Sequence, residues 1–243
     1  MLRSSLIKNA LPTCLIAIAL SYMVWGIPGD RGETPVLRWA EGQSGCTFSA
    51  DDDGKYRYGV WTEDLGIVIA VDADEVRKAS LRIAPLFGVS VTLRYRGKES
   101  LSVNPADISL EFVKHYHDVQ KAVDPNDFAA RLQNDADSFA EETQREIGKH
   151  PEKKAEKESI LQVHQTDVRE TQDFLKSHSL RAARLDSANP EVTGWVLFSA
   201  KSKWLGDWKK QEQFVLRIPI ADRVIEFPFA LPPSRGDLIL RRR

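Results

Sequence analysis

Two histidines separated by a single residue are the first candidates for chemistry in this sequence. His115 and His117 flank Tyr116 and directly follow the alternating segment 107–113. If that strand continues through residue 118, both imidazoles lie on one face of it, within reach of a single metal ion. No spacing among the other histidines matches a zinc signature. The competing interpretation is a strand end whose histidines are solvated or hydrogen-bonded to neighbours.

A second candidate site is the lysine-rich segment 201–210, which contains two tryptophans. Trp204 and Trp208 lie among four lysines, which include Lys203 and Lys209. Exposed tryptophans beside lysines suit an envelope sugar polymer, an anionic lipid surface or a protein partner. Alternatively, both indoles fold back onto the end of the domain while the lysines solvate its rim.

The remaining polar clusters form no recognisable catalytic or ligand-binding motif. Acidic groups at 51–53 and 72–75 stand at predicted turns and lack the spacing of a calcium-binding loop. The sequence contains no Gly-x-Ser-x-Gly turn and no phosphate-binding glycine loop. We therefore predict no catalytic activity and no cofactor. A metal-dependent protein or enzyme that uses His115 and His117 is the alternative.

Charge and cysteine content narrow the class of protein further. The formal net charge of −1 gives no electrostatic support for nucleic-acid binding. Of the two cysteines, Cys14 lies in an apolar segment, which leaves Cys46 without a partner in the rest of the chain. The fold is thus expected to depend on a packed core, with Cys46 free or buried, or else bridging two chains.

The N-terminal segment has the pattern of an export signal or a membrane anchor. Arg3 and Lys8 precede an uncharged apolar run at 11–27, and Tyr22 and Trp25 stand near its outer end. We predict a retained signal anchor in residues 1–28, which makes a single-pass protein of the cell membrane. The alternative is a signal peptide cleaved near Tyr22, which gives a secreted or periplasmic protein. Both place the rest of the chain outside the cytoplasm.

Beyond this segment the pattern predicts a tether at 29–46 and then an antiparallel β domain. Residues 29–45 are rich in glycine, proline and charge. Period-two alternation or short apolar runs then indicate strands, and no βαβ rhythm appears. The predicted domain covers 47–123 and 179–243. Its main strands are expected at 56–62, 65–71, 89–95, 107–113, 192–198, 212–218, 223–229 and 237–240.

Residues 124–178 interrupt the strands with a helical hairpin. Asp124 and Pro125 form a helix start, and Gly148 and Pro151 indicate a C-cap and a stop. A second helix is expected over 151–178, antiparallel to the first. The segment holds 13 acidic and 8 basic residues, so its exposed faces are strongly charged. We expect an insertion that serves as an arm for an envelope protein partner or for self-association.

The strand pattern resembles that of exported bacterial immunoglobulin-like domains. Segments 89–95 and 101–110 are similar to their early strands, and 194–198 and 214–218 are similar to their closing strands. This resemblance implies an immunoglobulin-like β-sandwich and no functional residue. The predicted architecture is mainly β with an α insertion: an N-terminal apolar helix, then a sandwich interrupted by the hairpin. The predicted function is a membrane-tethered extracytoplasmic binding or scaffolding module without catalytic activity.

Overall fold

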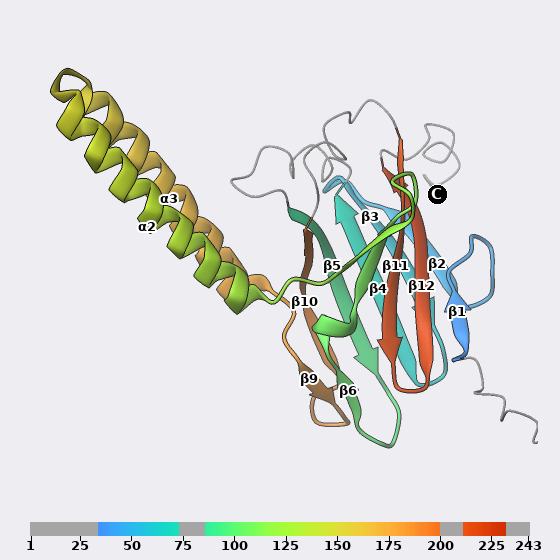
Figure 1. Ribbon diagram of the computed structural model, residues 1–243. Helices are drawn as coiled ribbons and strands as arrows, with labels where there is room; N and C mark the ends of the chain where they lie inside the picture. The colour runs from blue at the N-terminus through green and yellow to red at the C-terminus, as the bar shows by residue number, and fades with distance from the viewer. Residues whose placement is uncertain (1–33, 73–85, 200–210, 232–243) are drawn as a thin grey trace, which may run out of the picture. The chain divides into compact units, whose positions relative to one another are not determined.

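The structure is a computed structural model that describes residues 34–72, 86–199 and 211–231 (Figure 1). In these residues the chain is mainly β, with antiparallel sheets and one long helical hairpin, which confirms the predicted class. The predicted apolar helix at 11–27 and the strand at 237–240 lie outside the described residues. Within the described ranges, no helix has the length and apolar character needed to span a membrane.

The described strands form two five-stranded sheets and one small two-stranded sheet. Sheet A has the order β1-β12-β11-β7-β8, sheet B has the order β10-β5-β4-β3-β2, and sheet C pairs β6 with β9. The strands are β1 (Val36–Arg38), β2 (Cys46–Ala50), β3 (Lys55–Trp61), β4 (Leu65–Asp72), β5 (Leu86–Tyr95), β6 (Leu101–Val103), β7 (Ser109–Phe112), β8 (Asp118–Lys121), β9 (Ala183–Leu185), β10 (Glu191–Ser199), β11 (Glu212–Ile220) and β12 (Arg223–Leu231).

One hydrophobic core is shared by sheets A and B. Alternate residues of each strand point inward, as the period of a strand requires, and the buried set draws on both sheets. At its centre, the ring of Phe214 in sheet A stacks on Phe87 of sheet B at 4.8 Å and on Phe229 at 5.2 Å between centroids. Burial of such aromatic side chains is the main stabilising contribution available to a fold whose one described cysteine, Cys46, is a free thiol.

The predicted tether at 29–46 is wrong from Val36 onward. Residues Val36–Arg38 form β1, which pairs in parallel with β12 and adds an edge strand to sheet A. Trp39 follows and is buried in the core, where its indole Nε1 donates to the Thr47 carbonyl at 2.9 Å. The second half of the predicted tether is therefore part of the folded β domain, and the sheet is not purely antiparallel.

The helical hairpin consists of α2 (Pro125–Lys149) and α3 (Lys154–His178), joined by a short 3-10 turn at Pro151–Lys153. Asp124 is the N-cap, as predicted, and accepts hydrogen bonds from the backbone N–H groups of Asn126 and Asp127. The predicted C-cap at Gly148 is wrong, because the helix continues to Lys149 and is capped by His150. The second helix begins at Lys154 and not at Pro151, since the proline starts the intervening turn.

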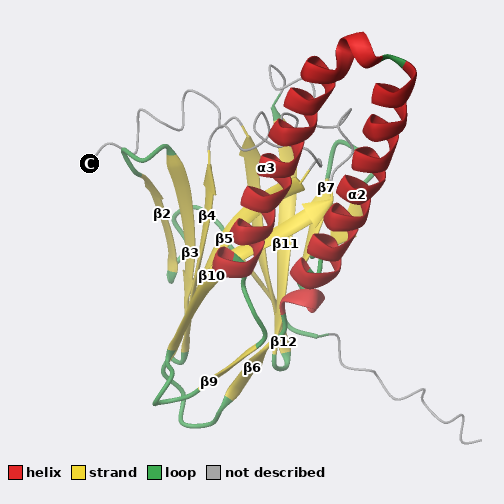
Figure 2. Ribbon diagram, turned by 90° about the vertical axis from the view of Figure 1, so that its left-hand side faces the viewer, coloured by secondary structure: helices red, strands yellow, loops and turns green. Residues whose placement is uncertain are grey.

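The hairpin joins the β domain at its base. A second hydrophobic cluster there combines side chains of both helices with Leu86 and Leu197 on the outward face of sheet B. The chain enters α2 through Val123, whose N–H donates to the Leu197 carbonyl at 2.8 Å. From this base the two helices run side by side away from the sheets (Figures 1 and 2).

Candidate functional site

His115 and His117 lie in the turn between β7 and β8 and not on an extended strand. The strand ends at Phe112, and the His115 N–H donates to the Phe112 carbonyl at 3.0 Å. A second turn follows, in which the Asp118 N–H donates to the His115 carbonyl at 3.2 Å. Tyr116 and His117 have φ values of 60° and 57°, which are uncommon for residues with a side chain. The premise that one strand places both imidazoles on one face is therefore wrong.

Each histidine of this turn contacts a different carboxylate. His117 Nδ1 lies 2.5 Å from Glu111 Oε1 on β7, whereas His115 Nε2 lies 3.2 Å from Glu212 Oε2 on β11. Among the described residues, no group of three or more His, Cys, Asp or Glu side chains is placed to hold a metal ion. The metal site at His115 and His117 stays a prediction that this geometry does not support.

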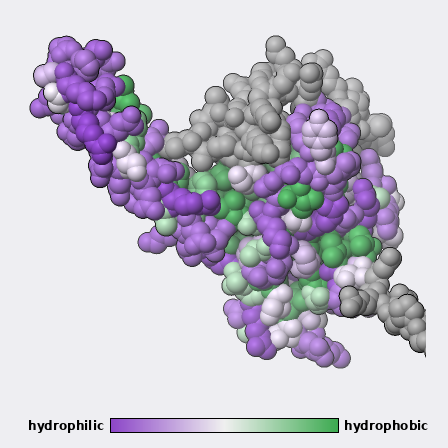
Figure 3. Space-filling model, in the orientation of Figure 1, coloured by the Kyte–Doolittle hydropathy of each residue, from purple (hydrophilic) through white to green (hydrophobic). Residues whose placement is uncertain are grey.

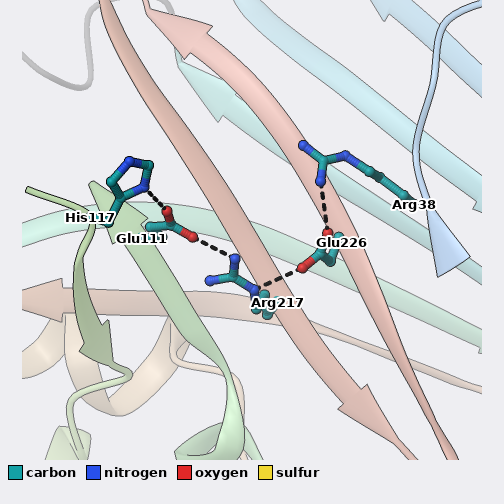
Figure 4. A network of polar contacts seen from close by, with 5 residues as sticks. All are labelled: Arg38, Glu111, His117, Arg217 and Glu226. Atoms are coloured by element: carbon teal, nitrogen blue, oxygen red, sulfur yellow. Dashed lines mark hydrogen bonds and ion pairs between the residues drawn. The ribbon is translucent and has the colours of Figure 1, made fainter. Parts of the chain in front are cut away.

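The contact between His117 and Glu111 begins a charged ladder across the outward face of sheet A (Figure 4). Arg217 on β11 bridges two carboxylates: its Nη2 donates to Glu111, and its Nε donates to Glu226 Oε1 at 2.8 Å. Glu226 on β12 in turn accepts from Arg38 Nη1 on β1 at 3.2 Å. The charged ladder therefore links strands β7, β11, β12 and β1 through alternating charges.

The Glu111 carboxylate of the charged ladder is held ionised. Glu111 is only 8% exposed, yet the hydrogen bond with His117, and then that with Arg217, lowers the pKa of Glu111 below its ordinary value despite burial. Burial would lower the pKa of Arg217, but hydrogen bonds to Glu111 and Glu226 outweigh it and raise that pKa. Because each central charge has an opposite partner, the charged ladder ties the four strands together, and its end at His117 is exposed.

The tryptophan and lysine candidates lie elsewhere. Trp204, Trp208, Lys203 and Lys209 fall outside the described residues, so the ligand-binding site predicted there stays a prediction.

The hairpin carries exposed apolar side chains, which make it a candidate interaction site. Ile160 and Val163 on α3 are 47% and 59% exposed. Figure 3 shows the hairpin as mostly hydrophilic, with a hydrophobic patch on its flank toward the far end. Between the helices lies an open groove of about 450 Å³, whose floor includes the buried Ala136 and Val168 and whose walls carry four glutamines: Gln133, Gln162, Gln165 and Gln172.

Sequence reasoning missed two tryptophans on the outward face of sheet B. Trp61 ends β3 and Trp195 lies in β10, and both are half-buried. Two glycines inside strands, Gly59 and Gly66, are the sequence signal that could have identified Trp61. A glycine inside a strand often marks a position where another group packs directly on the backbone.

The comparisons with known proteins give no relative. No family model, no curated protein and no solved structure matches the chain.

Proposed function

We propose that the protein is a non-enzymatic binding or scaffolding module whose hairpin α2–α3 is the arm that binds a protein partner. In this proposal the segment 11–27 holds the chain at the membrane, and the β domain lies outside the cytoplasm as an immunoglobulin-like sandwich. The apolar run and its preceding basic residues support the anchor.

The observation that carries the proposal is the length of the hairpin beyond its attachment to the sheets. Each helix has 25 residues, which corresponds to about 37 Å at 1.5 Å per residue. The hydrophobic cluster at the base reaches only to Ala136 on α2 and Val168 on α3. The part of the hairpin beyond this cluster contributes no side chain to the main core. Binding to a partner is the simplest role for such an extension.

The distal half of the hairpin has the chemistry of a contact surface. Ile160 and Val163 are one helical turn apart and lie on the same flank of α3. Isoleucine and valine at such exposure are stabilised by a partner that removes them from water. The charged residues of the hairpin supply the polar rim that a protein interface requires. The glutamine-lined groove lies nearer the base, since its floor residues Ala136 and Val168 belong to the basal cluster.

Site-specific photocrosslinking in intact cells tests this role. We expect a photoreactive residue at Val163 to form one discrete crosslinked species in the full-length protein, identified by mass spectrometry as a partner or a second copy. The substitution Ile160→Ser should reduce that species strongly, because it removes the neighbouring apolar contact. The matched control is the same photoreactive residue at Glu142, which is exposed on α2.

Two outcomes would overturn the proposal. One is an absence of any discrete crosslink from Val163. The other is an identical pattern from Val163 and Glu142, since random collision and not a defined surface would then explain the product.

A further inference from the structure

The indole of Trp61 lies flat on the outward face of sheet B. Its partner across the β3–β4 ladder is Gly66, and a Cβ there would sit 2.3 Å from the Trp61 ring carbon Cζ3. Gly59 faces the same side, where a Cβ would lie 2.9 Å from Trp61 Nε1. The indole Nε1 donates to Thr47 Oγ1 at 3.2 Å, which fixes the orientation of the ring. Two glycines therefore allow one face of the ring to rest on the backbone, while the ring stays only half-buried.

Trp195 occupies the opposite corner of the same face. The centroid of its ring lies 6.0 Å from that of Phe174 at the base of the hairpin and 5.8 Å from Lys55 Nζ, and the residue is half-buried. The register places Trp61, Gly66 and Arg94 in one cross-strand row, and Ala70, Ser90 and Trp195 in a row four residues further along. Three strand spacings of about 4.8 Å and four residues of about 3.4 Å separate the Cα atoms of the two tryptophans by roughly 20 Å. This is the span of several sugar rings in an extended chain.

The surface between the two tryptophans is built from small and hydroxyl-bearing side chains. Val68, Ala70, Ser90, Thr92 and Thr193 point outward there, and the hydroxyls of Thr92 and Thr193 lie 3.0 Å apart. Short side chains keep the face level, so that an extended ligand can contact both indoles.

The charged residues on this face lie close to opposite charges. Lys55 is opposite Asp72 in the β3–β4 register, and its Nζ also lies 5.8 Å from the centroid of the Trp195 ring. Arg94 Nε donates to Glu191 Oε2 at 2.8 Å, and Arg57 pairs with both Asp51 and Asp53. Because the guanidinium groups have carboxylate partners and Lys55 stands opposite Asp72, the positive and negative charges of the face nearly balance. The face therefore offers little attraction to a polyanion such as nucleic acid or to an anionic membrane. An uncharged ligand is the better electrostatic match.

From this arrangement we propose that the outward face of sheet B binds an extended, uncharged polysaccharide chain, with Trp61 and Trp195 stacked against sugar rings at the two ends. The apolar faces of pyranose rings can pack on a flat indole, because tryptophan combines a large apolar ring surface with a single polar N–H group. The threonine and serine hydroxyls, together with the exposed ion pairs, supply hydrogen-bond partners for sugar hydroxyls. This surface meets the hairpin at its base, where Phe174 lies beside Trp195, whereas the arm proposal depends on Ile160 and Val163 further along α3. The two proposals are therefore tested by different residues.

Titration calorimetry with the full-length protein, in a buffer without sugar-based detergent, tests the proposal. The probes are the β-1,4-linked hexasaccharides of glucose and of N-acetylglucosamine, which distinguish a plain glucan from an acetamido glycan. We expect Trp195→Ala to weaken binding about three- to ten-fold, since one stacked aromatic contact is lost. Gly66→Ala should weaken binding similarly while retaining all tryptophans, because the added methyl lifts the Trp61 ring from the sheet.

Controls separate loss of the site from loss of the fold. Val36→Ala alters an exposed residue of sheet A and should leave the affinity unchanged, and thermal unfolding should show that each variant is folded. If Gly66→Ala fails to fold, Trp61→Phe takes its place.

The proposal is overturned if neither hexasaccharide binds at millimolar concentration. It is also overturned if binding is lost in a Trp204→Ala, Trp208→Ala double variant but retained in Trp195→Ala and in the Trp61-site variant.

Discussion

Glu111 is the residue on which the charged ladder depends, because it contacts His117 with one oxygen and Arg217 with the other. Replacing it by glutamine removes the charge from a side chain that is 8% exposed and weakens both contacts. We expect Glu111→Gln to lower the free energy of unfolding by about 2 kcal/mol, as for a partly buried pair that loses one partner. Denaturant titration at pH 7 measures this. The control is Glu191→Gln, whose ion pair with Arg94 is well exposed and should cost less than about 1 kcal/mol.

Glu111 should also make the free energy of unfolding depend on pH. The pKa of Glu111 in the folded protein lies below its ordinary value of 4.5, because of the hydrogen bond with His117 and then Arg217. The folded state therefore binds this proton more weakly than the unfolded state. The stabilisation is complete above the unfolded pKa and is lost as pH falls through the folded pKa. We expect the difference in unfolding free energy between the parent and Glu111→Gln to narrow between about pH 5 and pH 3. If the difference in unfolding free energy between the two proteins stays constant across that range, the lowered pKa of Glu111 does not contribute to stability.

At the scale of elements, the junction between hairpin and sheet depends on a close backbone approach. Gly194 in β10 lies so near the segment after α3 that a Cβ would sit 2.5 Å from the Leu180 Cα and N atoms. Backbone atoms cannot move aside as a flexible side chain does. We therefore expect Gly194→Ala to destabilise the protein by about 1–3 kcal/mol, the usual cost of overpacking.

A matched glycine in the hairpin gives the opposite expectation. Gly148 lies inside α2, and a Cβ there would meet no atom within 4 Å. Gly148→Ala should stabilise the helix by about 0.5–1 kcal/mol, because alanine loses less backbone entropy. Thermal unfolding of both variants checks the pair. Equal shifts in the same direction would show that the approach of Leu180 to Gly194 does not constrain the junction.

At the scale of the whole molecule, the sequence predicted long periodic elements well and short irregular ones badly. The predicted strand at 89–95 alternates cleanly and falls within β5, and Asp124 with Pro125 marked the start of α2 correctly. By contrast, β1 has three residues in a stretch rich in glycine, proline and charge. Its strand conformation depends on pairing with β12, which lies almost at the other end of the chain, and local patterns carry no information on such pairing.

The charged ladder escaped prediction for a related reason. Arg38 and Glu226 are 188 positions apart in the sequence, and only the register of four strands brings them beside Arg217 and Glu111. Likewise, the left-handed backbone at Tyr116 and His117 could not be predicted from their residue types. Glycine or asparagine at these positions would have indicated it. Residue types indicated candidates, whereas positions in the sheet decided which of them meet.

The parallel pairing of β1 with β12 has a mechanical consequence. Among the described strands, β1 is the first and β12 is the last, and the two lie side by side and run in the same direction. A pull on the chain ahead of Thr34 against an opposing pull beyond Leu231 therefore slides the two strands along each other. Their backbone bonds, including Val224 N–H to the Pro35 carbonyl at 2.9 Å and Trp39 N–H to the Glu226 carbonyl at 2.8 Å, then bear the load together and not one after another. The buried Trp39 and the Arg38–Glu226 pair add to that resistance, so this short strand acts as a shear clamp between the two ends of the β domain.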